Sequence, residues 1–241
     1  MVTGGRWALI SSLVPATGNP TQQTVARTRL LLDRYGIVSR DCLGNEDFPG
    51  GFGPIYKVLR EMEEQGRVRR GYFVDGLAGA QFAYAGAVDR LRAGRDRVEE
   101  RDHAVEQQDV QLLSAMDPAN PFGSLVSWPE VAEPEQGKPR RVAGAWVVLA
   151  RGRPVLYVAA RGKRVFTFPG TLRVEEGALE AALAALRQLP RSALRGQFVV
   201  EQIDGHPPRE SPHLEAFRSA GFSNDYRGLI LTESPGFDAV T

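Results

Sequence analysis

The chain has 241 residues, which is enough for one large domain or two smaller ones. Hydrophobic residues make up 42% and charged residues 24%, as in an ordinary globular protein. No apolar run reaches the roughly 18 residues that would indicate a membrane span. The net charge of +1 means that the chain as a whole does not attract nucleic acid, so the distribution of charge matters more. Basic residues cluster over 57–70 and 138–164.

Cysteine and histidine usage argues against a metal site. Cys42 is the one cysteine, so it forms no internal disulfide and has no cysteine partner for zinc. The three histidines are too scattered along the sequence to indicate a metal centre. The N-terminal stretch lacks the layout of a signal peptide. We therefore expect a cytoplasmic, metal-free protein.

The first half of the chain begins with a short predicted strand at residues 5–11, followed by a break rich in proline, glycine and asparagine. A helix is predicted over about residues 24–35, with Thr21 or Thr24 as its N-cap and Gly36 as its C-cap. Ser39 can cap a second, shorter helix.

A longer third helix follows, for which Pro54 suits the first turn and Gly66 the end. Its apolar residues recur at helical spacing and form one face; they are Ile55, Val58, Leu59 and Met62. Residues 67–86 then predict two strands around a glycine-rich turn at 75–79. Helix, short helix, longer helix and hairpin is the order of a winged helix-turn-helix; the alternative is another small α+β unit.

The middle of the chain is polar. Residues 87–106 mix both signs of charge and indicate an exposed helix or a linker. Residues 117–121, DPANP, predict a turn, because each proline disfavours helix at the residue before it. Residues 130–141 are polar, contain proline and show no periodicity, which favours a linker.

The second half opens with strand-like runs at 145–150, 154–160 and 164–168, which is the pattern of a β-meander. An amphipathic helix over 175–190, a strand over 198–205, a short helix and a last strand follow. This mixed α/β layout fits a small open sheet or a partly closed, barrel-like one.

These elements predict an α+β fold, in which a winged helix-turn-helix unit precedes a mixed α/β module with a β-meander. We expect three regions. They are a winged-helix-like DNA-binding unit at 1–92, a charged helix and linker with the DPANP turn at 93–141, and the α/β module at 142–241.

The third helix is the predicted DNA-contacting element, since in winged-helix units this helix lies in the major groove. Basic residues at the start of the wing can contact phosphates. The expected DNA-binding residues are Tyr56, Lys57, Arg60, Arg67, Arg69 and Arg70. Against this, Glu61, Glu63 and Glu64 would repel phosphate, and the alternative is a unit that packs against other domains.

No phosphate-binding Walker loop is present, because no GxxxxGK[ST] pattern occurs in the sequence. The chain therefore cannot hydrolyse ATP in the manner of P-loop enzymes. The glycines of the PGGFGP segment are expected to allow a tight turn into the third helix; they are Gly50, Gly51 and Gly53.

The sequence shows no catalytic triad and no pair of metal ligands. Asp117 and Asp204 are expected to be turn residues. Asp225 lies close to Arg227, which favours a structural role, but a carboxylate beside a base-sized pocket can also act as a general base in N-glycosidic cleavage. The tryptophans can stack on unpaired bases or belong to the core; they are Trp7, Trp128 and Trp146.

Several segments together resemble the C-terminal region of Lhr-type (large helicase-related) superfamily 2 DNA helicases. The most specific are residues 48–83 and 115–129, which match in order and spacing. The others are residues 5–10, 34–41, 87–92 and 214–231.

The resemblance implies a DNA repair protein of the bacterial nucleoid that partners DNA, single-stranded or 3′-tailed. The helicase core would be supplied in cis or by a neighbouring chain, and ATP and magnesium would belong to that motor alone. The family's C-terminal module is similar to that of AlkZ-type alkyl-base DNA glycosylases, and some members are uracil-DNA glycosylases. Asp225 is then the candidate catalytic base.

Two departures from the family shape the expectations. The chain contains no motor motif, so we expect a fragment, a split gene product or an isolated remnant. The glutamine motif of AlkZ-type enzymes is not evident either. Three hypotheses on function remain. The chain is a DNA-binding accessory region, a DNA glycosylase that acts on uracil or alkylated bases in single-stranded DNA, or a protein-interaction or oligomerisation module.

Overall fold

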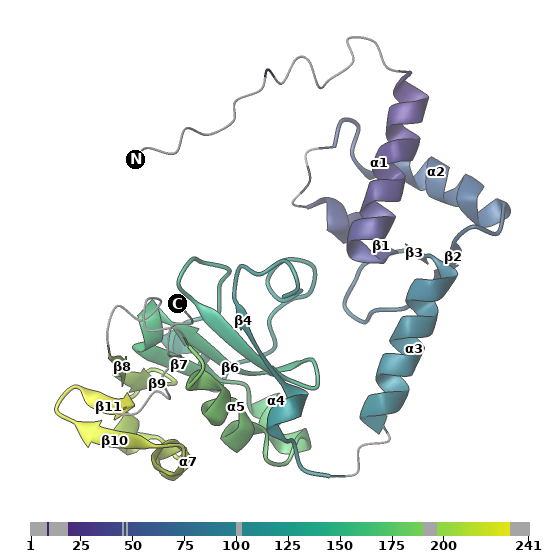
Figure 1. The fold of residues 1–241 in the computed structure, drawn as a ribbon. Helices are drawn as coiled ribbons and strands as arrows, with labels where there is room; N and C mark the ends of the chain where they lie inside the picture. Colours follow the sequence, from purple (N-terminus) through teal and green to yellow (C-terminus); the bar gives the residue numbers. More distant parts are fainter. Residues whose placement is uncertain are drawn as a thin grey trace, which may run out of the picture. The chain divides into compact units, whose positions relative to one another are not determined.

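The structure is a computed structural model that describes residues 9, 19–44, 46, 48–99, 103–189 and 197–231. It divides into two compact units, residues 1–95 and 96–241 (Figure 1). The strand predicted at residues 5–11 lies, apart from Leu9, outside the described residues.

Among its described residues, the first unit contains three α-helices, a short 3-10 helix and a small sheet. Its elements are α1 (Pro20–Tyr35), β1 (Ile37–Val38), η2 (Arg40–Leu43), α2 (Phe52–Glu64), β2 (Arg69–Gly71), β3 (Gln81–Ala83) and α3 (Ala85–Glu99), the last of which leads out of it. The strands are antiparallel in the order β1-β3-β2. This succession confirms the predicted winged helix-turn-helix (Figure 1).

The N-cap predicted for α1 is wrong. The helix begins at Pro20, and the side chain of Asn19 accepts a hydrogen bond from the backbone N–H of Thr21 at 2.9 Å. Pro20 is preset for the first helical position, so the cap falls one residue before it. Gly36 ends the helix as predicted, with a φ of 70°.

The larger of two hydrophobic clusters in the described part of the first unit packs its helices against its sheet. It joins α1, α2 and the sheet and consists of Leu31, Leu32, Val38, Ile55, Leu59, Met62, Val68 and Phe82. The predicted apolar face of α2 is confirmed, since Ile55 and Leu59 are fully buried and Met62 nearly so. Val58 lies partly buried beside them.

The described residues of the second unit form two sheets. The larger has the order β4-β5-β6-β7-β9, antiparallel except for the parallel pair β7 and β9. Its strands are β4 (Val110–Ser114), β5 (Trp146–Ala150), β6 (Arg153–Ala159), β7 (Arg164–Thr167) and β9 (Gln202–Ile203). The smaller sheet is antiparallel and consists of β10 (Phe222–Asp225), β11 (Gly228–Leu231) and β8 (Phe198–Val200), in that order. Over the described residues neither sheet closes into a barrel.

Helices connect and cover these strands. They are η3 (Gln107–Asp109), η4 (Pro134–Gln136), η5 (Ala160–Gly162), α4 (Pro169–Val174), α5 (Ala178–Leu186), η6 (Pro208–Glu210) and α7 (Leu214–Ser219). Side chains alternate along β6, so Leu156 and Val158 join the core beneath α5, while Tyr157 joins the opposite cluster with Phe166. The β-meander is confirmed, but the single strand predicted at 198–205 is wrong. It splits into β8 and β9, because the N–H groups of Glu201 and Gln202 both donate to the carbonyl of Lys163.

The stretch from 93 to 141 contains more regular structure than its composition suggests. Its strand β4 pairs along its whole length with β5. Residues 130–141, which favour a linker, contact the aromatic face of the large sheet instead. Val131 is buried there, and the hydroxyl of Tyr157 donates to the carbonyl of Arg140 at 2.9 Å. The prediction of a linker is therefore wrong at these residues, because a backbone carbonyl accepts a hydrogen bond from the sheet and the side chain of Val131 packs against it.

A buried ion cluster fixes one end of the large sheet. The side chain of Arg151 is 7% exposed, and its Nη2 lies 3.3 Å from Oδ2 of Asp109. Its Nη1 lies 3.2 Å from Oε2 of Glu175. Asp109 precedes β4, Arg151 lies in the turn between β5 and β6, and Glu175 follows α4. One guanidinium therefore joins three segments.

Replacing Arg151 with Ala is expected to lower the free energy of unfolding of the second unit by about 3–5 kcal/mol. Asp109 and Glu175, both buried, would then lose the buried guanidinium that they share. The control is Arg153→Ala, because Arg153 is 61% exposed and contacts the same Glu175, so about 0–1 kcal/mol is expected. Guanidinium denaturation, followed through Trp128 and Trp146, measures both. Equal losses of stability would contradict the role of Arg151.

Candidate nucleic-acid interface

Helix α2 is positioned by the turn before it and by its buried face. Gly50 and Gly51 adopt φ angles of 82° and 62°, so the predicted tight turn is confirmed at these two glycines. The third, Gly53, lies within the first turn of the helix. With Ile55 and Leu59 buried, Lys57 on the same helix is exposed to solvent.

Tyr56 lies at the border of the core. Its ring packs edge-on against Phe82, with 5.8 Å between centroids, and lies 5.9 Å from the ring of Phe52. It also lines a hollow of about 870 Å³ with Arg40 and with residues 78–80 of the loop between β2 and β3. One edge of Tyr56 is therefore available to a ligand at this hollow, whereas the rest is committed to packing.

Two of the predicted DNA-binding cations have carboxylate partners. Nη2 of Arg60 lies 3.2 Å from Glu64, one turn further along α2. Nε of Arg70 lies 3.3 Å from Glu63. These acids, expected to repel phosphate, thus neutralise two neighbouring cations.

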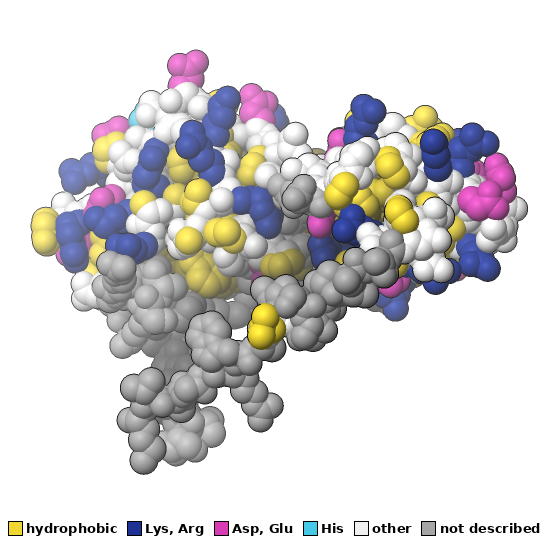
Figure 2. Space-filling model, turned by 90° about the horizontal axis from the view of Figure 1, so that it is seen from above, with side chains coloured by type: hydrophobic (Ala, Val, Ile, Leu, Met, Phe, Trp, Pro, Cys, Tyr) yellow, Lys and Arg dark blue, Asp and Glu magenta, His cyan; other side chains and the backbone are white. Residues whose placement is uncertain are grey.

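The remaining three cations carry the free positive charge of this surface. Lys57, Arg67 and Arg69 are exposed and have no ion-pair partner within the described part of the chain. Lys57 lies on α2, and Arg67 and Arg69 lie where the chain enters β2. On the face of the first unit drawn in Figure 2, Lys and Arg side chains lie among acidic ones, so the charge of that face is mixed.

The wing between β2 and β3 is held by a buried amide. Oε1 of Gln81 accepts hydrogen bonds from the N–H groups of Phe73 and Val74, both at 2.8 Å. Its Nε2 donates to the carbonyl oxygens of Val74 and Leu77 at 2.8 and 3.3 Å. The side chain of Gln81 therefore replaces the backbone partners that the loop lacks.

Two further residues that shape the wing surface, Asp41 and Tyr72, cannot be picked out from the sequence alone. Oδ2 of Asp41, on η2, accepts a hydrogen bond from the N–H of Ala78 at 2.7 Å and anchors the wing. Tyr72, at the start of the wing, is 88% exposed. In the sequence, the one signal of an ordered wing is Gln81 between Ala80 and Phe82. A polar side chain that is buried beside apolar neighbours seldom lacks hydrogen-bond partners.

Asp225, the candidate catalytic base, lies in the second unit at the tip of the hairpin formed by β10 and β11. Its Oδ1 accepts hydrogen bonds from the backbone N–H and from Nε of Arg227, both at 3.0 Å. The backbone bond first, and the side-chain bond second, lower the pKa of Asp225 below its usual value. The carboxyl lines a cavity of about 520 Å³ with Arg209, Arg218 and Tyr226.

The other two isolated acids have structural partners. Oδ1 of Asp117 accepts from the N–H of Ala119 at 2.8 Å, so its predicted role in a turn is confirmed. Asp204 is 7% exposed and accepts hydrogen bonds from the N–H and hydroxyl of Thr167, at 2.7 and 2.9 Å. It therefore ties β7 to the end of β9, a role beyond the predicted turn.

The tryptophans of the second unit belong to its packing. The ring of Trp128 stacks on Phe122 and Phe168. Trp146 is partly buried against the main core cluster. Trp7 lies outside the described residues.

Neither a metal centre nor a membrane helix is found in the part of the chain that the structure describes. Among those residues no group of three or more histidine, cysteine or acidic side chains is placed to hold a metal ion. Likewise, none of the described helices is long and apolar enough to cross a membrane.

The fold and this surface define a protein with a winged-helix unit followed by an α/β module. The winged-helix domain of large helicase-related proteins matches residues 17–103. The Lhr helicase/uracil glycosylase of Escherichia coli (strain K12) is 38% identical over 226 residues. The Lhr helicase/probable uracil glycosylase of Mycolicibacterium smegmatis is 39% identical over 238 residues.

These matches cover 93% and 94% of this chain, but only 14% and 15% of the two relatives. Residues 17–103 are therefore similar to the winged-helix domain of large helicase-related proteins, and most of the chain is similar to a small part of the two Lhr relatives.

Replacing Gln81 with Leu is expected to loosen the wing, because the four backbone groups would lose their partner while the apolar side chain stays buried. Hydrogen exchange at the amides of Phe73 and Val74 should accelerate about tenfold or more. The control is Asp75→Ala, which removes only a local bond to the N–H of Gly76. Unchanged exchange at Phe73 and Val74 in Gln81→Leu, with α1 still protected, would show that the amide does not hold the wing.

Proposed function

We propose that the chain is a DNA-binding accessory region of an Lhr-type ATP-dependent DNA repair helicase, and that it contains no motor of its own. The observation that carries the proposal is the set of exposed, unpaired cations Lys57, Arg67 and Arg69 on α2 and at the start of the wing, within the described residues. In winged-helix units these elements approach the major groove and the flanking phosphates.

The proposed DNA is single-stranded or 3′-tailed, and its partner in action is a helicase core in cis or in a neighbouring chain. On a tailed substrate, α2 and the wing would hold the duplex part. The mixed charge of the surface supports guidance of DNA rather than tight retention, because Arg60 and Arg70 are neutralised by their own acids. The proposed location is the bacterial nucleoid.

Reversing Lys57, Arg67 and Arg69 to Glu is expected to lower affinity for duplex DNA at least tenfold. It should also reduce the slope of log affinity against log salt by about 0.9 for each phosphate that the variant no longer neutralises. Fluorescence anisotropy with a labelled 3′-tailed duplex over a salt series measures both quantities.

The charge-matched control reverses Arg29, Arg90 and Arg92, which are exposed on α1 and α3. This control should retain most of the affinity, since no DNA contact is assigned to these residues. Equal losses of affinity in the two triple variants would show that the effect comes from the net charge of the chain alone. Undiminished binding after reversal of Lys57, Arg67 and Arg69 would reject the proposed surface.

A second candidate function is that of a DNA glycosylase. Both relatives carry uracil glycosylase in their names. Asp225 supports this candidate by its position, because it lines a cavity. The hydrogen bonds from Arg227 that lower its pKa make it a weaker general base. Its Oδ2 has no hydrogen bond among the described residues.

Uracil-containing single-stranded DNA, incubated with the chain and then treated with alkali, tests the glycosylase. The expected result is strand cleavage by the unaltered chain and loss of cleavage in Asp225→Asn. The control is Asp75→Asn, an exposed aspartate of the wing, which should leave cleavage unchanged. An uncleaved strand at high protein excess, or full cleavage by Asp225→Asn, would exclude Asp225 as the base.

A further inference from the structure

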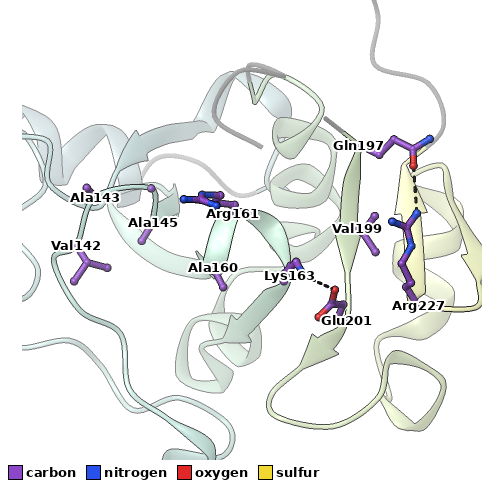
Figure 3. Close-up of a pocket in the computed structure, with 11 residues that line it drawn as sticks. Val142, Ala143, Ala145, Ala160, Arg161, Lys163, Gln197, Val199, Glu201 and Arg227 are labelled. Carbon is purple, nitrogen blue, oxygen red and sulfur yellow. Dashed lines mark hydrogen bonds and ion pairs between the residues drawn. The ribbon is translucent and has the colours of Figure 1, made fainter. Parts of the chain in front are cut away.

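A basic groove lies on the second unit, apart from the surface on α2. It begins as a pocket of about 610 Å³ lined by η5, the start of β8 and the hairpin (Figure 3). The charged residues that line it are Arg161, Lys163, Arg227 and Glu201. The neighbouring cavity beside Asp225 shares Arg227 and Glu201 and adds Arg209 and Arg218. Five cations and two carboxylates thus line the two hollows.

The turn that presents Arg161 is strained. Ala160 and Arg161 both have left-handed φ angles, 49° and 59°, and Gly162 follows at 97°. Residues other than glycine rarely adopt this backbone conformation, and it persists where neighbouring contacts impose it. Here the carbonyl of Lys163 accepts two hydrogen bonds from the start of β9, so the turn is fixed against the sheet.

Arg227 is held in place with most of its donors free. Its Nε donates to Asp225 and its Nη2 to Oε1 of Gln197 at 3.2 Å (Figure 3). The guanidinium also lies over the ring of Tyr226, 5.3 Å from its centroid. A guanidinium has five N–H donors, so three remain without a partner among the described residues. They can bind a phosphate oxygen with little loss of side-chain freedom.

Tyr226 adds an aromatic surface at the tip of the hairpin. Its side chain is 87% exposed, although apolar rings usually avoid water. Arg227 covers one face of the ring, which leaves the other face open. A base can stack there only when it is not already stacked within a duplex.

We propose that this groove binds a single strand of DNA, with phosphates on Arg161, Lys163 and Arg227 and an unpaired base on Tyr226. The inference rests on the proposed DNA-binding function for its choice of DNA as the ligand, but its residues are separate from those of α2 and the wing. Lys163 keeps a partner in Glu201, 2.8 Å away, so Arg161 and Arg227 are the stronger phosphate contacts.

The test uses a single-stranded oligodeoxynucleotide containing 2-aminopurine, whose fluorescence falls when the base stacks. The unaltered chain should quench the probe. Tyr226→Ala should abolish quenching and weaken binding about tenfold, without affecting the fold because the side chain is so exposed. Arg161→Ala should reduce the slope of log affinity against log salt by about 0.7.

Matched controls come from the same chain. Met116→Ala removes an exposed apolar side chain of the second unit, and Arg173→Ala removes an exposed cation of α4; both should leave quenching unchanged. Three results would overturn the proposed binding site. They are quenching that survives in Tyr226→Ala, an equal loss of quenching in the controls, and no binding by the unaltered chain. Tighter binding of an oligoribonucleotide of the same sequence would overturn the assignment to DNA.

The variant with Lys57, Arg67 and Arg69 reversed separates the two proposals. The groove predicts that this variant still quenches the single-stranded probe. Loss of duplex binding with quenching retained supports both sites. An unaltered chain that quenches the single strand but binds no duplex would reject the surface on α2 and support the groove.

Discussion

Which side chains of α2 face the solvent depends on the burial of Ile55 and Leu59. Both side chains are fully buried against α1 and the sheet, so the rotation of the helix about its axis is fixed. That rotation exposes Lys57 and sets Tyr56 at the border of the core. Charge on this helix is therefore oriented by hydrophobic packing, and the ion pairs along the helix then decide which cations stay free.

Buried polar groups hold the wing of the first unit and the sheets of the second in place. In the first unit, the amide of Gln81 satisfies four backbone groups of the wing, which would otherwise have to find water. In the second unit, Arg151 joins Asp109 and Glu175, while Asp204 ties β7 to β9. These residues touch no proposed ligand. They hold the wing and the sheets in the shapes that place Tyr72, Arg161 and Arg227 at the surface.

Local sequence patterns predict most of the winged-helix unit, because its helices have a clear apolar face and its turns contain glycine. The same patterns place Lys57, Arg67 and Arg69 correctly on exposed positions. They cannot show that Arg60 and Arg70 have partners, since that geometry depends on side-chain conformation. They mark the basic cluster at 138–164, but they do not show that Arg161 and Lys163 lie beside Arg227. The cationic segments of the groove are far apart in sequence. The pairing of β8 with β11 and the packing of η5 against β8 bring them together. The division of residues 198–203 between two sheets depends on the same long-range pairing.

The central claim is that α2 and the wing are the elements of the first unit that contact DNA. Amide chemical-shift changes in the isotopically labelled chain, measured as a 3′-tailed duplex is added at low salt, test it most directly. We expect the largest changes in the first unit to fall in α2 and in residues 72–80. Changes confined to α1 and α3, or none at all, would contradict the claim.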